Sequence, residues 1–329
     1  METGRISLAH RIKELVLGKS LSPHDQSIFH KLSLVAFFAW VGLGADGLSS
    51  SCYGPAEAFL ALGQHHTLAL VVALASGATV FIISAAYSQI IHLFPTGGGG
   101  YVVASKLLSP SVGMFSGCAL LIDYVLTITL SVASGADAVF SFLPPHWLGL
   151  KLPLAVAGVV LLSVLNLRGV KESVLVLMPV FLLFVATHAL VILYGVGAHL
   201  ADLPALAART GRDLAATHAE LGGMGMVLLL LRAYSMGAGT YTGIEAVSNG
   251  LPILREPKEV TGKRTMLYMA LSLSLTVVGL MVCYLLFAVA PQEGKTLNAV
   301  LFENITASFG VPGQWFVLVT LVSEAALLF

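Results

Sequence analysis

The stretch Trp40-Val41-Gly42-Leu43-Gly44-Ala45-Asp46-Gly47-Leu48-Ser49-Ser50-Ser51-Cys52-Tyr53-Gly54-Pro55, residues 40–55, decides how the chain is interpreted. It lies within a long apolar run, yet it holds four glycines, a proline, an aspartate and three serines. Glycine and proline destabilise a helix, and serine and aspartate compete for its backbone hydrogen bonds. Unwound backbone is tolerated at membrane depth only where protein covers it or a polar cavity adjoins it. In a chain that crosses a membrane, this stretch predicts a discontinuous helix.

The composition is that of an all-α, multi-pass membrane protein. Of the 329 residues, 57% are hydrophobic and 10% are charged, whereas soluble domains carry about 25% charged residues. Lys+Arg and Asp+Glu are 17 each, so there is no electrostatic basis for binding nucleic acid. The three cysteines, Cys52, Cys118 and Cys283, lie in apolar runs without metal-ligand spacing, which argues against disulfides and structural zinc.

Eight apolar runs approach the length of about 20 residues that a membrane helix needs. They cover 32–62, 67–93, 111–142, 152–168, 174–199, 224–251, 265–290 and 312–329. We therefore divide the chain into a polar tail, 1–31, a first group of five spans, 32–199, a polar loop expected to be helical, 200–223, and a second group of three spans, 224–329. The last run stops at Phe329 without a polar flank, which predicts a C-terminally truncated sequence that ends within a second repeat.

The positive charges predict the orientation in the cell membrane, because cytoplasmic segments are rich in Lys and Arg. If the N-terminus is cytoplasmic, the outer segments contain only Lys151, Arg209, Arg212 and Lys295. The inner segments then contain Arg5, Arg11, Lys13, Lys19, Lys31, Lys106, Arg168, Lys171, Arg255, Lys258, Lys263 and Arg264. This bias predicts a cytoplasmic tail and an extracellular 200–223 loop.

The sixth run repeats the features of the first. The stretch Ser235-Met236-Gly237-Ala238-Gly239-Thr240-Tyr241-Thr242-Gly243-Ile244-Glu245-Ala246, residues 235–246, again interrupts apolar sequence with small residues, hydroxyls and a carboxylate. Because the two runs lie five spans apart, they would cross in opposite directions, as an inverted repeat requires. Interrupted helices at corresponding positions of two halves are typical of the binding site of a secondary transporter. The alternative is two glycine-rich helices that pack tightly.

Three carboxylates, Asp46, Asp123 and Glu245, fall inside these runs without a Lys or Arg at comparable depth. A charge at the bilayer centre costs about 2.5–3.5 kcal/mol on insertion scales. A bound cation would offset this cost, and so would protonation of the acids. The alternative is a set of neutral, hydrogen-bonded acids that only hold helices together.

The third run adds hydroxyls to one of these carboxylates. Asp123, Thr127 and Ser131 are spaced by four residues and therefore share a helix face, whereas Thr129 points elsewhere. Oxygen-only ligation suits hard, weakly polarising cations. The alternative for each hydroxyl is a bond to the carbonyl four residues earlier. In the fifth run, His188 is expected to be a hydrogen-bonded packing residue rather than a proton carrier.

These residues resemble the amino acid–polyamine–organocation (APC) superfamily, and residues 44–55 resemble the first-helix signature of KUP-type potassium importers of the KimA group. The resemblance implies a LeuT-like five-plus-five inverted repeat with broken first and sixth helices. It also implies a C-terminal region with dimer contacts, and hence a homodimer of the full-length protein. The positions that match the cation-site residues of that group are Asp46, Tyr53, Asp123, Thr127, Ser131, Thr242 and Glu245.

We therefore expect a potassium importer coupled to protons, not an enzyme, whose cation ligands are Asp46, Tyr53, Asp123, Thr127, Ser131 and Thr242. Glu245 is the residue expected to carry the coupled proton. The expected partners are the potassium ion, the proton and the lipid bilayer, and no cofactor is expected. The alternatives are an amino acid or polyamine symporter on the same scaffold and, less consistent with the sequence, a passive channel.

Overall fold

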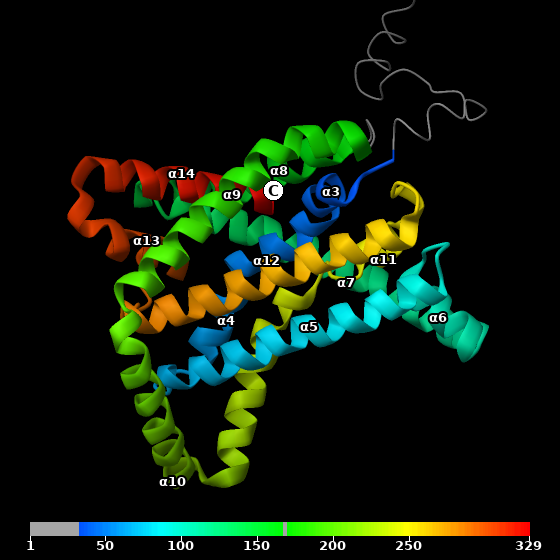
Figure 1. The fold of residues 1–329 in the computed structure, drawn as a ribbon. Coiled ribbons are helices and arrows are strands. Elements are labelled where there is room, and N and C mark those ends of the chain that lie inside the picture. Colours follow the sequence, from blue (N-terminus) through cyan, green and yellow to red (C-terminus); the bar gives the residue numbers. More distant parts are fainter. Residues whose placement is uncertain (1–32, 167–169) are drawn as a thin grey trace, which may run out of the picture.

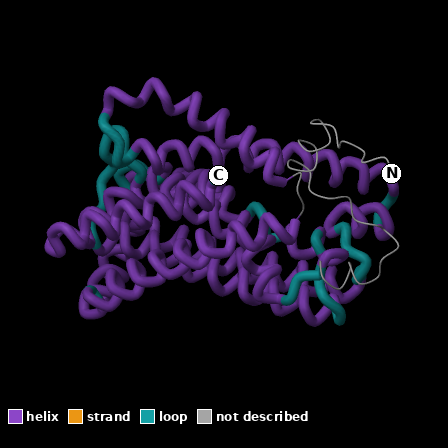
Figure 2. Tube along the Cα trace, turned by 90° about the horizontal axis from the view of Figure 1, so that it is seen from above, coloured by secondary structure: helices purple, strands orange, loops and turns teal. Residues whose placement is uncertain are grey.

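The computed structural model describes residues 33–166 and 170–329, so the predicted tail, 1–31, lies outside the described residues. The described chain is helical, apart from one isolated bridge between Leu34 and Leu254 (Figures 1 and 2). The α-helices are α3 (Ala36–Ser49), α4 (Gly54–Ala61), α5 (Ala69–Leu93), α6 (Gly99–Leu107), α7 (Pro110–Phe140), α8 (Lys151–Asn166), α9 (Val170–Ala198), α10 (Leu203–Met236), α11 (Ala246–Asn249), α12 (Lys258–Leu286), α13 (Leu297–Thr306) and α14 (Gly310–Leu328). Short 3₁₀ segments are η1 (Ser50–Cys52), η2 (His66–Leu68), η3 (Pro145–Leu150), η4 (Leu200–Asp202), η5 (Gly237–Tyr241), η6 (Leu251–Ile253) and η7 (Ala307–Phe309).

Six stretches of the described chain are long and apolar enough to cross a membrane. They cover His66–Leu93, Pro110–Phe140, Leu177–Ala198, Leu200–Asn249, Lys258–Leu286 and Leu297–Leu328. Two of the eight predicted runs are absent from this set. The first is broken into α3, of 14 residues, and α4, of 8 residues, and the fourth forms α8, of 16 residues. The helical, membrane-spanning class expected from the composition is thereby confirmed.

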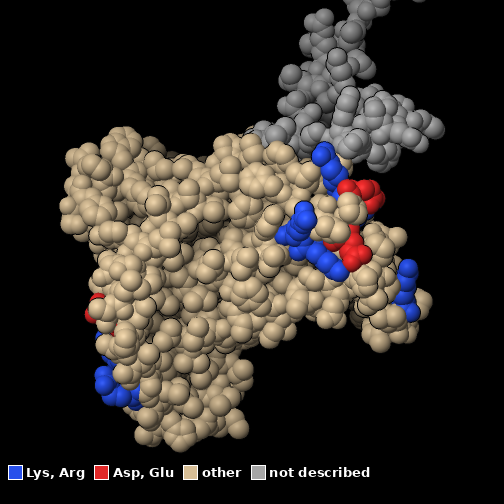
Figure 3. Space-filling view, viewed as in Figure 1, with Lys and Arg blue, Asp and Glu red and all other residues tan. Residues whose placement is uncertain are grey.

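The surface matches a protein surrounded by lipid. Figure 3 shows Lys, Arg, Asp and Glu gathered at the ends of the bundle, with a broad uncharged surface between them. At one end, the start of α12 carries the ion pairs Lys258–Glu256 and Lys263–Glu259. Large apolar side chains of α7 and α8 are exposed, among them Phe115, Leu126 and Val160. An apolar band between charged ends is the pattern that a bilayer requires.

The core is organised around α12, which runs through the middle of the bundle beside α5 (Figure 1). In the most apolar 18-residue segment of α12, 67% of the residues are buried, a larger share than in any other candidate span of the described chain. α12 also packs against α3 and α9. α12 has no charged residue after Arg264, and its hydroxyls at Ser272 and Thr276 donate to carbonyls of the same helix, so it stays unbroken.

The loop 200–223 is helical, as expected. It forms the first part of α10, which bends sharply at Gly222, where φ is 71° and ψ is 169°. This arm is tied to the turn before α5, because Asp213 Oδ2 accepts a hydrogen bond from Thr67 Oγ1 at 2.5 Å and Thr217 Oγ1 lies 2.9 Å from His65 Nδ1. The apolar runs did not predict α13, a short buried helix that begins where Thr296 Oγ1 accepts a hydrogen bond from Ala299 N at 3.1 Å.

Gly243, where the two breaks cross, has no room for a side chain, which gives a stability prediction. A Cβ added at Gly243, whose φ is 83°, would lie 2.7 Å from both Asp46 Oδ2 and Gly47 N. We expect Gly243→Ala to lower the free energy of unfolding by about 1–3 kcal/mol, because a methyl group there forces backbone shifts. Thermal unfolding of the purified protein in detergent measures this.

The matched control is Gly211→Ala in α10, where an added Cβ meets no atom within 4 Å in the described chain. Alanine is the better helix former, so this variant should be as stable as the parent or more so. Equal losses in the two variants would show that the crossing of the breaks is not tightly packed.

Candidate functional site

The breaks of the first and sixth helical regions lie against each other. η1 touches η5, and Ser50 Oγ donates hydrogen bonds to the Gly47 carbonyl, at 2.5 Å, and to the Thr240 carbonyl, at 3.2 Å. At Gly239 an added Cβ would come within 2.8 Å of the Tyr53 ring. The glycines of both stretches therefore let two unwound backbones approach closely, which explains why both stretches are rich in them.

The serines of the first break serve the backbone. Ser49 Oγ donates to the Asp46 carbonyl at 2.9 Å, and Ser51 Oγ donates to the Leu48 carbonyl at 2.6 Å. Both carbonyls also accept from the Ser50 backbone N–H, so the two hydroxyls bring additional donors to the polar end of α3 in an apolar environment. The side chains left to face a ligand are those of Asp46 and Tyr53.

The predicted polar face of α7 points into the protein. Thr127 and Ser131 are buried, whereas Ile128 and Leu130 on other faces are exposed. Thr129 is also exposed, and its hydroxyl donates to the Val125 carbonyl at 2.7 Å, the local bond that had been the alternative for the whole set. Within the described chain, Thr127 and Ser131 make no such bond, so their hydroxyl oxygens are available to a ligand.

One cavity gathers three of the predicted cation ligands. Asp46, Thr127 and Ser131 line a cavity of about 240 Å³ between α3, α7, α8 and the end of α14. Its other walls come from apolar side chains such as Val132 and Leu327. An apolar cavity with a few convergent oxygen groups is the usual form of a small-ligand site.

A second cavity gathers two further predicted residues. Asp123 and Glu245 line a space of about 290 Å³ beside α6, together with Tyr87, Tyr101 and Asn249. Asn249 Nδ2 donates to the Tyr124 hydroxyl at 3.0 Å. Glu245 is buried, and its Oε1 has no hydrogen-bond partner in the described chain. A buried acceptor without a donor marks a place where a ligand or a proton can bind.

Tyr53 lies between the α7 face and the second break. Its hydroxyl lies next to the Ser131 and Thr242 side chains, yet within the described ranges it is not aligned for a hydrogen bond with either of them. Thr242 Oγ1 donates to the Gly239 carbonyl at 2.7 Å, which leaves its lone pairs free to accept. Five of the seven predicted residues thus line the two cavities, Tyr53 lines a third space of about 290 Å³ that it shares with Cys52, and Thr242 lies beside Tyr53.

The carboxylates of the site have no positively charged side chain beside them in the described chain. Asp46 and Glu245 each interact with Asp123, and with each other, so their charges repel when all are ionised. Among the residues that the structure describes, none of the three forms an ion pair with a Lys or Arg, because the ion pairs lie elsewhere. A cation or a proton would relieve this repulsion.

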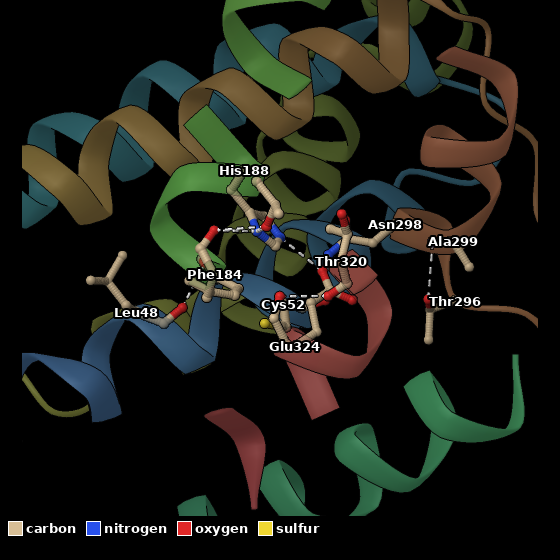
Figure 4. Close-up of polar contacts among 12 residues, drawn as sticks. Leu48, Cys52, Phe184, His188, Thr296, Asn298, Ala299, Thr320 and Glu324 are labelled. Atoms are coloured by element: carbon tan, nitrogen blue, oxygen red, sulfur yellow. Dashed lines mark hydrogen bonds and ion pairs between the residues drawn. The ribbon is translucent and has the colours of Figure 1, made fainter. Parts of the chain in front are cut away.

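The structure also contains a buried polar network that the sequence did not predict (Figure 4). His188 Nε2 lies 2.9 Å from Glu324 Oε1, and Asn298 Nδ2 donates to the same oxygen at 2.5 Å. His188 is fully buried and hydrogen-bonded, as expected, but no depth could be assigned to Glu324 from the sequence. Its partners come from α9 and α13, and no spacing within one segment indicates such a cluster.

Comparison with known proteins gives the family. A family model described as amino acid permease matches residues 32–327, nearly the whole chain. The chain belongs to the amino acid permease family. The family resemblance expected from the sequence is therefore confirmed, and the match indicates a transporter rather than an enzyme.

Two curated relatives of the permease carry informative names. It is 33% identical over 297 residues to the potassium transporter KimA of Bacillus subtilis, a match that covers 88% of this chain and 47% of the relative. It is 24% identical over 177 residues to the low-affinity putrescine importer PlaP of Escherichia coli K12, covering 52% of this chain and 36% of that relative. The matched residues thus span about half of the length of these relatives or less, 47% of KimA and 36% of PlaP.

The inward face of α7 gives a testable prediction about ligand binding. If Thr127 and Ser131 offer their oxygens to a potassium ion, potassium should raise the melting temperature of the purified permease. At a potassium concentration one hundred times Kd, binding should add about 2.7 kcal/mol to the free energy of unfolding. Thr127→Val should abolish this increase, because it removes the oxygen while retaining the volume. Scanning fluorimetry in potassium against choline chloride measures it.

Thr129→Val is the matched control, since Thr129 lies on the same helix but faces outward. It should leave the potassium-dependent stabilisation unchanged. An equal loss in both variants would contradict the assignment of the α7 face to the ion.

Proposed function

We propose that the permease is a secondary active transporter that imports potassium together with protons by alternating access. The observation that supports this best is the set of three carboxylates, Asp46, Asp123 and Glu245, that face two adjoining cavities without a basic partner among the described residues. The 33% identity to a potassium transporter supports the same substrate.

Potassium fits the oxygens that these cavities offer. An ion that leaves water needs oxygen atoms that replace its hydration shell. The carboxylates of Asp46 and Asp123 and the hydroxyls of Tyr53, Thr127 and Ser131 supply such oxygens, and Thr242 adds another at the second break. Strongly polarising metals need a different set, and the described residues contain no group of three His, Cys, Asp or Glu side chains suited to one.

Glu245 is the group we assign to the coupled proton. It is buried, and its free Oε1 shares the second cavity with Asp123. A proton on Glu245 removes one of two neighbouring negative charges, and its loss restores the repulsion. Movement of protons through this carboxyl would therefore change the affinity of the site for a cation.

Alternating access requires a path to each side, and cavities lie on both sides of the breaks. One space of about 290 Å³ reaches Cys52 and Tyr53 from the side of Lys295, and the space around Asp123 and Glu245 opens beside α6. By the charge-based orientation the first is extracellular and the second cytoplasmic. Rocking of one helix group against the other, as in inverted-repeat transporters, would expose the site to each in turn.

A second candidate substrate is an organic cation such as a polyamine. The match to a putrescine importer favours it, and the three acids suit any cation. An amino acid is less compatible, because ionised Asp46 at the first break would repel its carboxylate. The homodimer implied by the resemblance is part of the same proposal.

The transport function can be tested by growth. A bacterial strain without its own potassium importers, expressing the permease from its gene, should grow at low potassium and grow better with an inward proton gradient. Asp123→Asn should abolish this rescue, because the ion loses a charged ligand. Absence of rescue by a well-expressed, membrane-inserted protein would contradict potassium as the substrate, and excess putrescine that blocks uptake would favour a polyamine.

The proton assignment needs a separate measurement. Glu245→Gln should lower gradient-driven potassium uptake by about tenfold, within the usual range of coupling between two sites. The variant should still bind potassium, because the glutamine keeps an oxygen at the same position. Wild-type proton coupling in this variant would contradict the role given to Glu245.

A further inference from the structure

A buried His–Glu pair lies outside the two cavities that hold the predicted cation ligands. His188 on α9 and Glu324 on α14 have side chains only 1% and 2% exposed, and their Nε2 and Oε1 atoms are 2.9 Å apart. Figure 4 shows the two side chains pointing at each other from the two helices. Burying two ionisable groups is expensive, and a hydrophobic pair of the same volume is often as stable. The pair therefore needs an explanation other than stability.

The hydrogen bonds of this pair determine how many protons it holds. His188 Nδ1 lies 2.9 Å from the Phe184 carbonyl, which can only accept, so Nδ1 carries a hydrogen. The bond between Nε2 and Oε1 then contains one proton, whether it is assigned to the imidazole or to the carboxyl. If that proton leaves, two lone pairs face each other at 2.9 Å and the side chains must separate. The observed geometry is thus that of a loaded, single-proton site.

The proton on this pair is linked to the first helix break through Asn298. The Tyr284 hydroxyl donates to Asn298 Oδ1 and thereby orients the amide. Asn298 Nδ2 then donates to Glu324 Oε1 at 2.5 Å and to the Cys52 carbonyl at 3.3 Å. Cys52 ends η1 and precedes Tyr53, a predicted cation ligand. A movement of Glu324 away from His188 would therefore act through the Asn298 amide on the Cys52 carbonyl, next to a predicted cation ligand.

The pair has an access route from one side of the molecule. Glu324 lines the space of about 290 Å³ that also reaches Cys52 and Tyr53. The charged groups of this space are Glu57, Asp137, which pairs with Lys151, and Lys295, which pairs with Glu303. The other titratable groups that face Glu324 are the Cys52 thiol and the Tyr284 hydroxyl. Glu57 is thus the acid of this space that has no basic partner in the described chain.

We propose that His188 and Glu324 form a proton-binding site, separate from Glu245, that is loaded from the Glu57 side and that controls the first helix break through Asn298. This inference rests on the proposed function, because it adds a second protonation step to the same transport cycle. It gives roles to His188, Glu324 and Asn298, and it departs from the expectation, drawn from the sequence, that His188 is a packing residue rather than a proton carrier.

The test compares two kinds of transport in proteoliposomes of the purified protein. Rubidium uptake driven by an inward proton gradient requires proton release, whereas rubidium–potassium exchange at equal pH does not. We expect Glu324→Gln, which keeps the volume and the bond from Asn298, to lower gradient-driven uptake by about tenfold while exchange stays close to wild type. His188→Gln should have the same selective effect. Uptake by both variants should also depend less on external pH, because the removed group no longer takes up a proton.

The matched control is His92→Gln, which removes the histidine of an exposed His–Glu pair, His92 and Glu259, with a contact of 2.8 Å. It should leave both kinds of transport unchanged. The inference is overturned if exchange and driven uptake fall together in Glu324→Gln and His188→Gln, or if neither variant folds, since the pair is then structural. It is also overturned if uptake by the two variants keeps the wild-type pH profile. Absence of rubidium transport by the wild type overturns the proposed function itself, an outcome distinct from these.

Discussion

The contact between two unwound backbones is the interaction on which the rest of this structure depends. In a bilayer, a broken helix leaves carbonyl and amide groups without partners, and each such group costs several kcal/mol unless another group satisfies it. Here the two breaks satisfy each other in part, through Ser50 and the Thr240 carbonyl, and the remaining serines bond to nearby carbonyls of α3. The glycines at this crossing allow the approach. As a result, a polar centre lies inside an apolar protein, and a ligand can bind at that centre.

The polar centre also explains the placement of the other helices. α7 turns Thr127 and Ser131 inward toward the cavity that Asp46 lines, while large apolar residues such as Leu126 and Ile128 are exposed. α12 is apolar and deeply buried because it packs beside α5 and α3 and contributes no group to the cavities.

The two groups of ionisable residues in the interior differ in a way that matters for mechanism. Asp46, Asp123 and Glu245 carry free oxygens and repel one another, so they favour a positive ligand. His188 and Glu324 form a buried pair in which both ring nitrogens and Glu324 Oε1 contact protein groups, and in the proposal this pair holds one proton. The first group therefore suits a cation that enters and leaves, and the second suits a proton. Cys52 and Tyr53, neighbours in the first break, connect the two.

The sequence by itself determined the helical membrane class, the positions of both breaks and the inward face of α7. These features follow from composition and from spacing within one segment: glycine and proline interrupt a helix wherever they occur, and residues four apart share a face. Only the tertiary structure decided which breaks touch, that Asp46 and Asp123 line different cavities, and that Glu324 meets His188 and Asn298. The physical reason is that these contacts join helices far apart in the chain, where no local periodicity links the partners. The short buried helix α13 belongs to the same class, because packing against α14 and α12, and not its own apolar length, places it.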